Sequence, residues 1–417
     1  MIDIPKDKLR QGRIEAFTKV KKQRRRKKQW QAITAVAIIF LSFLLTVRVS
    51  PTIASYAAKI PGLSVIVELV QENEGIKDAI ANEYYEELGI LVQDKDVTIT
   101  LQGAIIDEYG VMLMYDFDYP KEKKDHHNYS VNIYQGDQLL ENSLSYGTMD
   151  GLNEPVAHSN HILEMTLDQP LDTANRNFRV EFEMRDGDKQ TISIPFTLEK
   201  PIAKAKIVEP NASITAQGQR LSINKIIRTP LRIHIEVKPD PSNTMQIVAL
   251  DDISLELKNG SKRELIRNGL VGSGSFREGR YTLYLQSNYF YDSDELIVRI
   301  GEIQAVPKGE DYIEVDFTTK EVLYKPDFID WDIKVVGNDV YLNAPVKDDH
   351  GRQHLFPAEK EDGTSLESEG SSFSTSAYEG FNYREYYEPY NGRAKLWINY
   401  IDNPIATDVE LKINLTE

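Results

Sequence analysis

The sequence predicts a mainly β protein with one N-terminal transmembrane helix, short juxtamembrane helices, and then tandem immunoglobulin-like β-sandwich domains. Three observations carry this prediction. Residues 31–47 contain no charged side chain, a two-residue alternation of apolar and polar side chains starts near residue 91, and that alternation recurs in three rounds. Helical periodicity is nearly absent after residue 90.

Residues 30–48 are predicted to form the transmembrane helix. The uncharged run Gln31–Val47 would be roughly 26 Å long as a helix, and Trp30 and Arg48 can extend it to the membrane surfaces. A buried core helix is the alternative, but such a helix normally has one polar face. A cleaved signal peptide is the second alternative, but the segment before the run is longer than in signal peptides.

A dense basic cluster precedes the run and sets its orientation. Lys and Arg remain on the cytoplasmic side of a membrane, so residues 1–29 are expected to be a cytoplasmic tail and everything after the span extracellular. The topology signal consists of Lys21, Lys22, Arg24, Arg25, Arg26, Lys27 and Lys28.

Charge is divided in the same way. Residues 1–30 hold 12 Lys/Arg against 3 Asp/Glu, whereas residues 31–417 hold 37 against 62. An exterior this acidic argues against nucleic acid as a partner, while the basic tail suits anionic lipid head groups. The chain has no cysteine, so its exterior domains must be held by their own cores without disulfides.

The tail carries one apolar stripe. Leu9, Ala16, Phe17 and Val20 fall close together on a helical wheel. The stripe could lie on lipid as a membrane-surface helix or dock on a cytoplasmic partner.

Residues 49–90 are predicted to form a juxtamembrane helical segment. Pro51 and Pro61 punctuate it, and apolar residues then recur at helical spacing up to Tyr84. We expect two or three short helices that end near Gly89.

Three β-rich rounds follow, which we assign to domains at residues 91–200, 201–320 and 321–417. Val97–Leu101 and Val111–Tyr119 open the first round, and similar pairs of alternating runs open the other two. Each round has about the length of one immunoglobulin-like sandwich. A fused pair of domains with a degenerate third is the alternative.

Few residue groups suggest chemistry. His126, His127, His158 and His161 lie in two predicted loops and could in principle hold zinc, but no motif such as His-Glu-x-x-His accompanies them. The acidic loops at 348–350 and 359–362 lack the spaced ligands of a calcium site. His234 falls on the polar side of a predicted strand and is expected in solvent.

One aromatic cluster stands out near the C-terminus. Packing inside a hairpin of the third domain is favoured over a peptide- or glycan-binding patch, because Tyr favours strands. No nucleophile elbow, phosphate loop or dinucleotide motif is present, so we expect no enzyme, no cofactor and no metal site. The cluster comprises Tyr378, Phe381, Tyr383, Tyr386, Tyr387 and Tyr390.

Three stretches resemble the Gram-positive membrane proteins of domain-of-unknown-function family 4179. They read RVSPTIASYAAKIPGLSVIVELV, EGIKDAIANEYYEELGI and VTITLQGAIIDEYGVMLMYDF. The resemblance covers about residues 30–200, and the second domain is similar to a companion domain that often follows. It implies an anti-sigma factor that pairs with an extracytoplasmic-function sigma factor.

The sequence therefore supports two alternative hypotheses for the function. In the first, the protein is a single-pass membrane regulator whose tail holds a sigma factor through Leu9, Ala16, Phe17 and Val20 while the exterior senses or anchors. In the second, it is an envelope structural or adhesive protein that binds a cell-wall or protein ligand outside, and the tail is only a topology signal.

Overall fold

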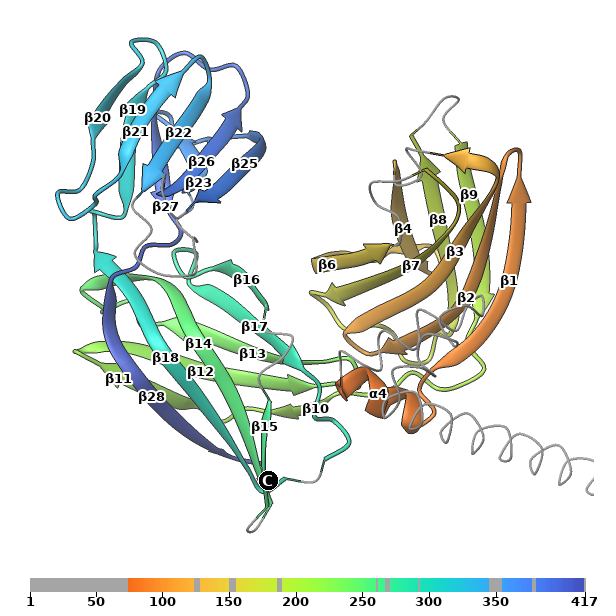
Figure 1. The fold of residues 1–417 in the computed structure, drawn as a ribbon. Helices are drawn as coiled ribbons and strands as arrows, with labels where there is room; N and C mark the ends of the chain where they lie inside the picture. Colours follow the sequence, from red (N-terminus) through yellow and green to blue (C-terminus); the bar gives the residue numbers. More distant parts are fainter. Residues whose placement is uncertain are drawn as a thin grey trace, which may run out of the picture.

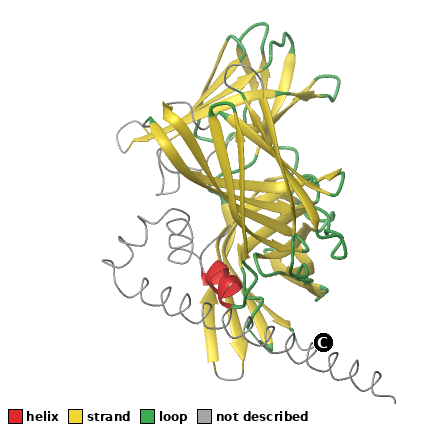
Figure 2. Ribbon diagram, turned by 90° about the vertical axis from the view of Figure 1, so that its right-hand side faces the viewer, coloured by secondary structure: helices red, strands yellow, loops and turns green. Residues whose placement is uncertain are grey.

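The computed structural model describes residues 74–123, 128–149, 155–185, 190–259, 262–266, 271–291, 293–344, 355–376 and 380–415. The predicted tail, transmembrane helix and first juxtamembrane helices lie outside these residues. Within the described ranges no helix is long and apolar enough to cross a membrane. The described chain is mainly β, with antiparallel sheets and one short helix, α4 (Glu74–Ala81) (Figure 2).

The first β unit contains two sheets that face each other. One sheet has the strand order β1 (Glu86–Asp94), β2 (Val97–Asp107), β3 (Gly110–Lys123), β7 (Val156–Leu167) and β6 (Asn142–Met149). The other has the order β5 (Gln138–Leu139), β4 (Tyr129–Gln135), β8 (Asn177–Met184) and β9 (Gln190–Thr197).

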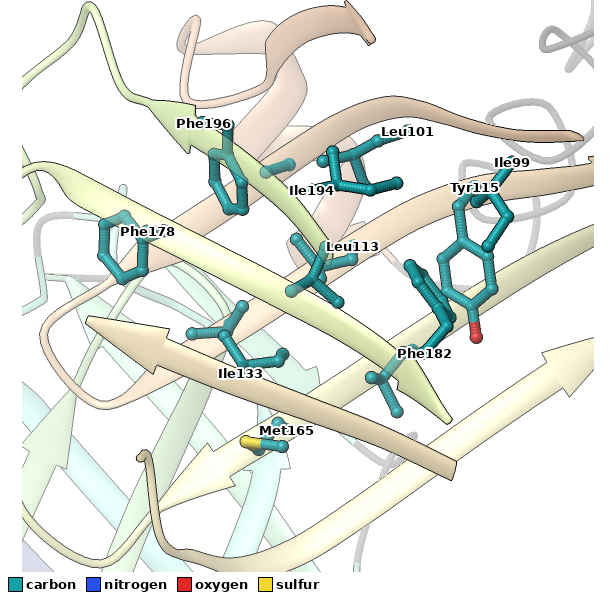
Figure 3. Packing of buried hydrophobic residues seen from close by; sticks show 14 of the residues in the cluster. Ile99, Leu101, Leu113, Tyr115, Ile133, Met165, Phe178, Phe182, Ile194 and Phe196 are labelled. Carbon is teal, nitrogen blue, oxygen red and sulfur yellow. The ribbon is translucent and has the colours of Figure 1, made fainter. Parts of the chain in front are cut away.

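Alternation decides which side chains form the core of this unit. In β9 the apolar residues Ile192, Ile194 and Phe196 point inward, and the residues that alternate with them are exposed. Ile194 and Phe196 share one core with Leu113 and Tyr115 from the opposite sheet (Figure 3). β3 departs from alternation and is buried on both faces from Gly110 to Phe117, which indicates that something covers the outer face of its sheet.

The beginning of this unit differs from the prediction. α4 ends at Ala81, and β1 already begins at Glu86, whereas helix was expected up to Gly89. Gly89 has φ of 59° and lies where the β1–β2 register shifts between Glu87 and Ile90. The glycine that suggested a helix end is therefore a β-bulge residue.

The second β unit also has two sheets. The first sheet has the order β10 (Lys206–Val208), β12 (Gln219–Arg228), β13 (Arg232–Pro239), β17 (Arg280–Gln286) and β16 (Val271–Ser275), with β11 (Ala212–Ala216) also on β12. The second has the order β15 (Lys262–Ile266), β14 (Met245–Asn259), β18 (Glu295–Pro307) and β28 (Pro404–Asn414).

The third β unit is inserted into the second. One of its sheets has the order β20 (Glu321–Tyr324), β19 (Tyr312–Asp316), β27 (Arg393–Ile398), β23 (Leu355–Lys360) and β24 (Ser365–Leu366). The other has the order β21 (Asp332–Val336), β22 (Asp339–Ala344), β26 (Gly380–Tyr387) and β25 (Ser368–Ser376).

The last strand corrects the expected extent of the third domain. Residues 321–417 were assigned to it, but β28 pairs with β18 from Glu295↔Asn414 to Gln304↔Pro404. Ile405 and Ile413 belong to the core of the second unit. The chain therefore leaves the second unit after β18, builds the third unit, and returns to complete the sheet it left (Figure 1).

Candidate functional site

α4 joins the first two units. Its residues Ile76, Ala79 and Ile80 are buried and share one helix face, because positions three and four apart lie on the same side. This face covers the outer side of the first unit's larger sheet (Figure 1), which explains the burial of both faces of β3. The residues that it packs against are Ile105, Met112, Met114 and Ile162 of the first unit and Leu231 of the second.

The start of α4 also touches the second unit directly. A Cβ on Gly75 would lie 3.0 Å from the backbone nitrogen of Ser287 and 3.1 Å from its Cβ. Beyond the helix, Tyr84 packs against Phe290 with ring centroids 5.2 Å apart and against Tyr289 at 6.3 Å. α4 and the residues after it are thus held by both units at once.

The turn between β2 and β3 inserts into the second unit. Asp107 accepts the N–H of Tyr109 within the turn and the N–H of Leu231 across the junction, both at 2.9 Å. Glu108 accepts the N–H of Ala205 at 2.7 Å and donates its own N–H to the carbonyl of Ala203 at 2.9 Å. Residues 107–110 therefore act as a docking tip.

Tyr109 of the docking tip lies beside a buried histidine, His234. The ring of His234 lies 5.7 Å from that of Tyr109 and 5.0 Å from that of Tyr284, and its side chain is 4% exposed. Burial, together with the charges of Arg232 and Lys225, lowers the pKa of His234 to about 3. The prediction that His234 lies in solvent is wrong, since the outer face of β13 is covered by the first unit.

A buried ion pair crosses the same junction. Arg232 donates from Nε to Oε1 of Glu164, and from Nη2 to Oε2 of Glu164 at 2.9 Å. The side chains are 10% and 8% exposed. A two-point contact of this kind fixes orientation as well as distance, because the guanidinium and carboxylate planes must align.

Among the acidic side chains of the junction, Asp107 has the most strongly shifted pKa. It is fully buried, and burial raises its pKa to about 6 against the hydrogen bonds from Leu231, Thr229 and Tyr109, which lower it. The negative charge of Glu164 contributes in the upward direction. The junction thus contains a carboxyl group that titrates close to neutral pH.

Of the four histidines considered for zinc, the structure describes two. His126 and His127 lie outside the described residues. His158 and His161 lie in β7, where a loop was expected; His158 is exposed and contacts Asp118 at 2.8 Å, whereas His161 is buried. Across the described ranges no three potential metal ligands cluster.

The other predicted groups have structural surroundings. Phe381, Tyr383 and Tyr387 are buried in the core of the third unit, as hairpin packing predicts; Tyr378 lies outside the described residues. The segment 359–362 was expected to be a loop, but Glu359 and Lys360 end β23, and Asp362 accepts the N–H of Thr364 at 3.0 Å in the turn that follows. The tail stripe and the basic cluster lie outside the described residues.

Sequence reasoning missed the docking tip. Its residues Asp107, Glu108, Tyr109 and Gly110 read as an ordinary turn between two alternating strands. The sequence did contain a signal, because continuous apolar runs flank the turn at Ala104–Ile106 and Val111–Tyr115. A strand that is covered on one face alternates apolar and polar residues, so continuous runs indicate strands that are covered on both faces.

Residues 23–118 match the family described as Domain of unknown function (DUF4179). Residues 205–328 match the Family of unknown function (DUF5643). No curated protein matches the chain. Among solved structures, the conserved domain protein from Bacillus anthracis is 18% identical, with coverage of 55% of this chain and 82% of that chain and a TM-score of 0.38. A TM-score this low does not establish a shared fold.

These matches fall on the two sides of the junction. α4 and the docking tip lie within residues 23–118, while Leu231, Arg232 and His234 lie within residues 205–328. The chain is therefore similar to the DUF4179 family over residues 23–118 and to the DUF5643 family over residues 205–328, and α4 and the docking tip join these two segments, whereas Glu164, the partner of Arg232, lies between the two matches.

Proposed function

We propose that this protein is a single-pass membrane regulator, an anti-sigma factor that holds an extracytoplasmic-function sigma factor by its cytoplasmic tail. Its exterior, a set of immunoglobulin-like sandwiches, senses or anchors outside the cell. The observation that carries the proposal is the position of α4, which is clamped between two β units. The chain before α4 leads to the predicted membrane span.

The clamp supplies a physical route from the exterior to the membrane. Ile76, Ala79 and Ile80 are buried by both units, so a change in the angle between the units must move α4 or release it. Packed junctions of this kind switch between discrete arrangements and do not deform continuously.

The cytoplasmic part of the proposal rests on the resemblance and on the tail. A tail that serves only as a topology signal needs the basic cluster and gains nothing from an apolar stripe. A docking helix needs an apolar anchor together with charges that steer its partner. Phe17 is the largest side chain of the stripe and should be the main anchor.

The test is a pull-down of the full-length protein in detergent. Phe17→Glu should abolish co-purification of a sigma factor, while membrane insertion persists because the basic cluster is intact. Thr18→Glu is the matched control, since residue 18 lies on the opposite side of the helical wheel. If no sigma factor co-purified with the wild type, the envelope structural or adhesive function would be favoured instead.

Orientation has its own test, because the chain has no native cysteine. An impermeant thiol reagent applied to intact cells should label Asn259→Cys, at the exposed end of β14, and should not label Gln11→Cys. Labelling of Gln11→Cys alone would reverse the proposed topology.

A further inference from the structure

One strand of the second unit has a bare edge. β14 pairs with β18 from Met245 to Lys258, but on its other side β15 covers only Leu255–Asn259. Within the part of the chain that the structure describes, no strand pairs with the first half of β14 on that side. An edge of this kind presents main-chain donors and acceptors in strand geometry.

This edge borders a cavity of about 400 Å³. Six consecutive residues of β14, Gln246–Asp251, line it. A strand that borders a cavity by one face contributes every second residue, so a continuous run means that the edge itself is turned toward the space. The opposite wall holds Gly272 and the stacked rings of Phe276 and Tyr281, whose centroids lie 4.3 Å apart.

The direction of one main-chain group supports this geometry. Ala305 is the β18 partner of Ile247, and its N–H points away toward the carbonyl of Asn403 at 3.3 Å. In an antiparallel pair whose members do not bond each other, both residues direct N–H and C=O outward. The N–H and C=O of Ile247 therefore face the cavity.

The chain covers one of these groups with its own side chain. Nε2 of Gln246 donates to the carbonyl of Ile247 at 2.8 Å. A local side-chain cap of this kind blunts a strand edge without closing it, and an incoming strand can displace it.

We propose that the groove between β14 and β16 binds an extended polypeptide segment, which adds to the sheet as a strand beside Gln246–Asp251. Main-chain groups at strand spacing select an extended polypeptide, since its N–H and C=O groups repeat at the same interval. The apolar wall at Leu250, Phe276 and Tyr281 selects an apolar side chain at alternate positions. This site is separate from the tail, so it does not depend on the sigma-factor proposal.

The test uses the full-length protein in detergent and a phage-displayed library of random dodecapeptides. Selected peptides, made synthetically, should bind the wild type and slow hydrogen exchange of the Ile247 amide. Ala249→Trp fills the cavity and should weaken binding at least tenfold. Gln246→Ala removes the competing cap and should tighten binding by about twofold to tenfold, the value of one ordinary hydrogen bond.

Val336→Trp is the matched control, because it adds the same ring at an exposed apolar position of the third unit. Its affinity should equal that of the wild type. The proposal would be overturned if no peptide were enriched, if the selected peptides bound Ala249→Trp as well as the wild type, or if Gln246→Ala left their affinity unchanged.

Discussion

The carboxylate of Asp107 accepts the backbone N–H of Leu231 across the junction between two β units, at 2.9 Å. The side chain is fully buried, and its second oxygen accepts the N–H of Tyr109 at the same distance. One acid thus orders its own turn and attaches that turn to the neighbouring unit. A buried charge that also forms the attachment makes the strength of the junction depend on pH.

The first prediction concerns this pH dependence. The pKa of Asp107 is about 6 in the folded protein, against an ordinary value of 3.8 in the unfolded chain. The folded state therefore binds the proton more tightly. Its contribution to stability is fully present below pH 3.8 and is lost as pH rises through 6. The difference corresponds to roughly 3 kcal/mol. The amide of Leu231 should therefore show a higher protection factor at pH 5 than at pH 7.5.

Asp107→Asn removes this titration and is the comparison that isolates it. The pKa of His234 is lowered, so its contribution is lost as pH falls below its ordinary range and opposes that of Asp107. Only the difference between wild type and Asp107→Asn is informative. An unchanged difference between pH 5 and pH 7.5 would contradict the role given to Asp107.

The second prediction concerns the Glu164–Arg232 pair. Glu164→Leu or Arg232→Met alone should lower the free energy of unfolding by about 3–5 kcal/mol, because each leaves a buried charge without its partner. The double variant Glu164→Leu/Arg232→Met should recover much of this loss, since both charges are removed together. Denaturant titration of the full-length protein in detergent measures all of these variants. If the loss of unfolding free energy in the double variant equalled the sum of the two single losses, the two side chains would not interact.

Much of the fold could be predicted from local pattern. Alternation predicted the strand around Val97–Leu101, because one covered face imposes a period of two. The place of β28 could not be predicted in this way. Its alternation fits any sheet, and its partner β18 lies about a hundred residues earlier, beyond the reach of a local pattern.

The site was less predictable for a related reason. Period two tells which face of a strand turns inward, but it does not tell whether another unit covers the outer face. His234 was therefore expected in solvent, although the first unit buries it. The resemblance to the DUF4179 family did mark the right segments, since its quoted motifs contain α4 and residues 107–110.

The third prediction separates α4 from the second unit. Gly75→Val places atoms within about 3 Å of Ser287, where the backbone nitrogen is the nearest neighbour. The helix should move away and fray, and the amides of Asn82 and Tyr84, which bond to Asp78 and Ala79, should exchange at least about tenfold faster.

Ala81→Val is the matched control for Gly75→Val. It adds a β-branched residue to the same helix at a partly exposed position, without the contact to Ser287. Val has a lower helix propensity than Ala and a higher one than Gly, so propensity alone would weaken the helix in Ala81→Val and not in Gly75→Val. If the amides exchanged no faster in Gly75→Val than in Ala81→Val, the evidence that α4 is clamped at Gly75 would be removed.

The fourth prediction tests the insertion of the third unit. A chain that ends at Asn403 lacks β28, so it exposes the edge of β18 and removes Ile405 and Ile413 from the core of the second unit. The second unit should unfold, and the amides of β14 and β18 should lose protection. The third unit should remain folded, as reported by the fluorescence of Trp331, which is buried in that unit's core.

The complementary variant removes the third unit and keeps the strand. Replacement of Lys308–Ile401 by a short Gly/Ser linker should preserve the second unit, because Asn403 already lies beside β18, with its N–H bonded to Oε1 of Gln304 at 2.7 Å. Protection of the β14 and β18 amides should match that of the wild type. If instead the shortened chain lost this protection while the chain ending at Asn403 kept it, the C-terminal strand would belong with the third unit. The chain ending at Asn403 is therefore expected to lose protection of these amides and the shortened chain to keep it, although the shortened chain lacks far more residues.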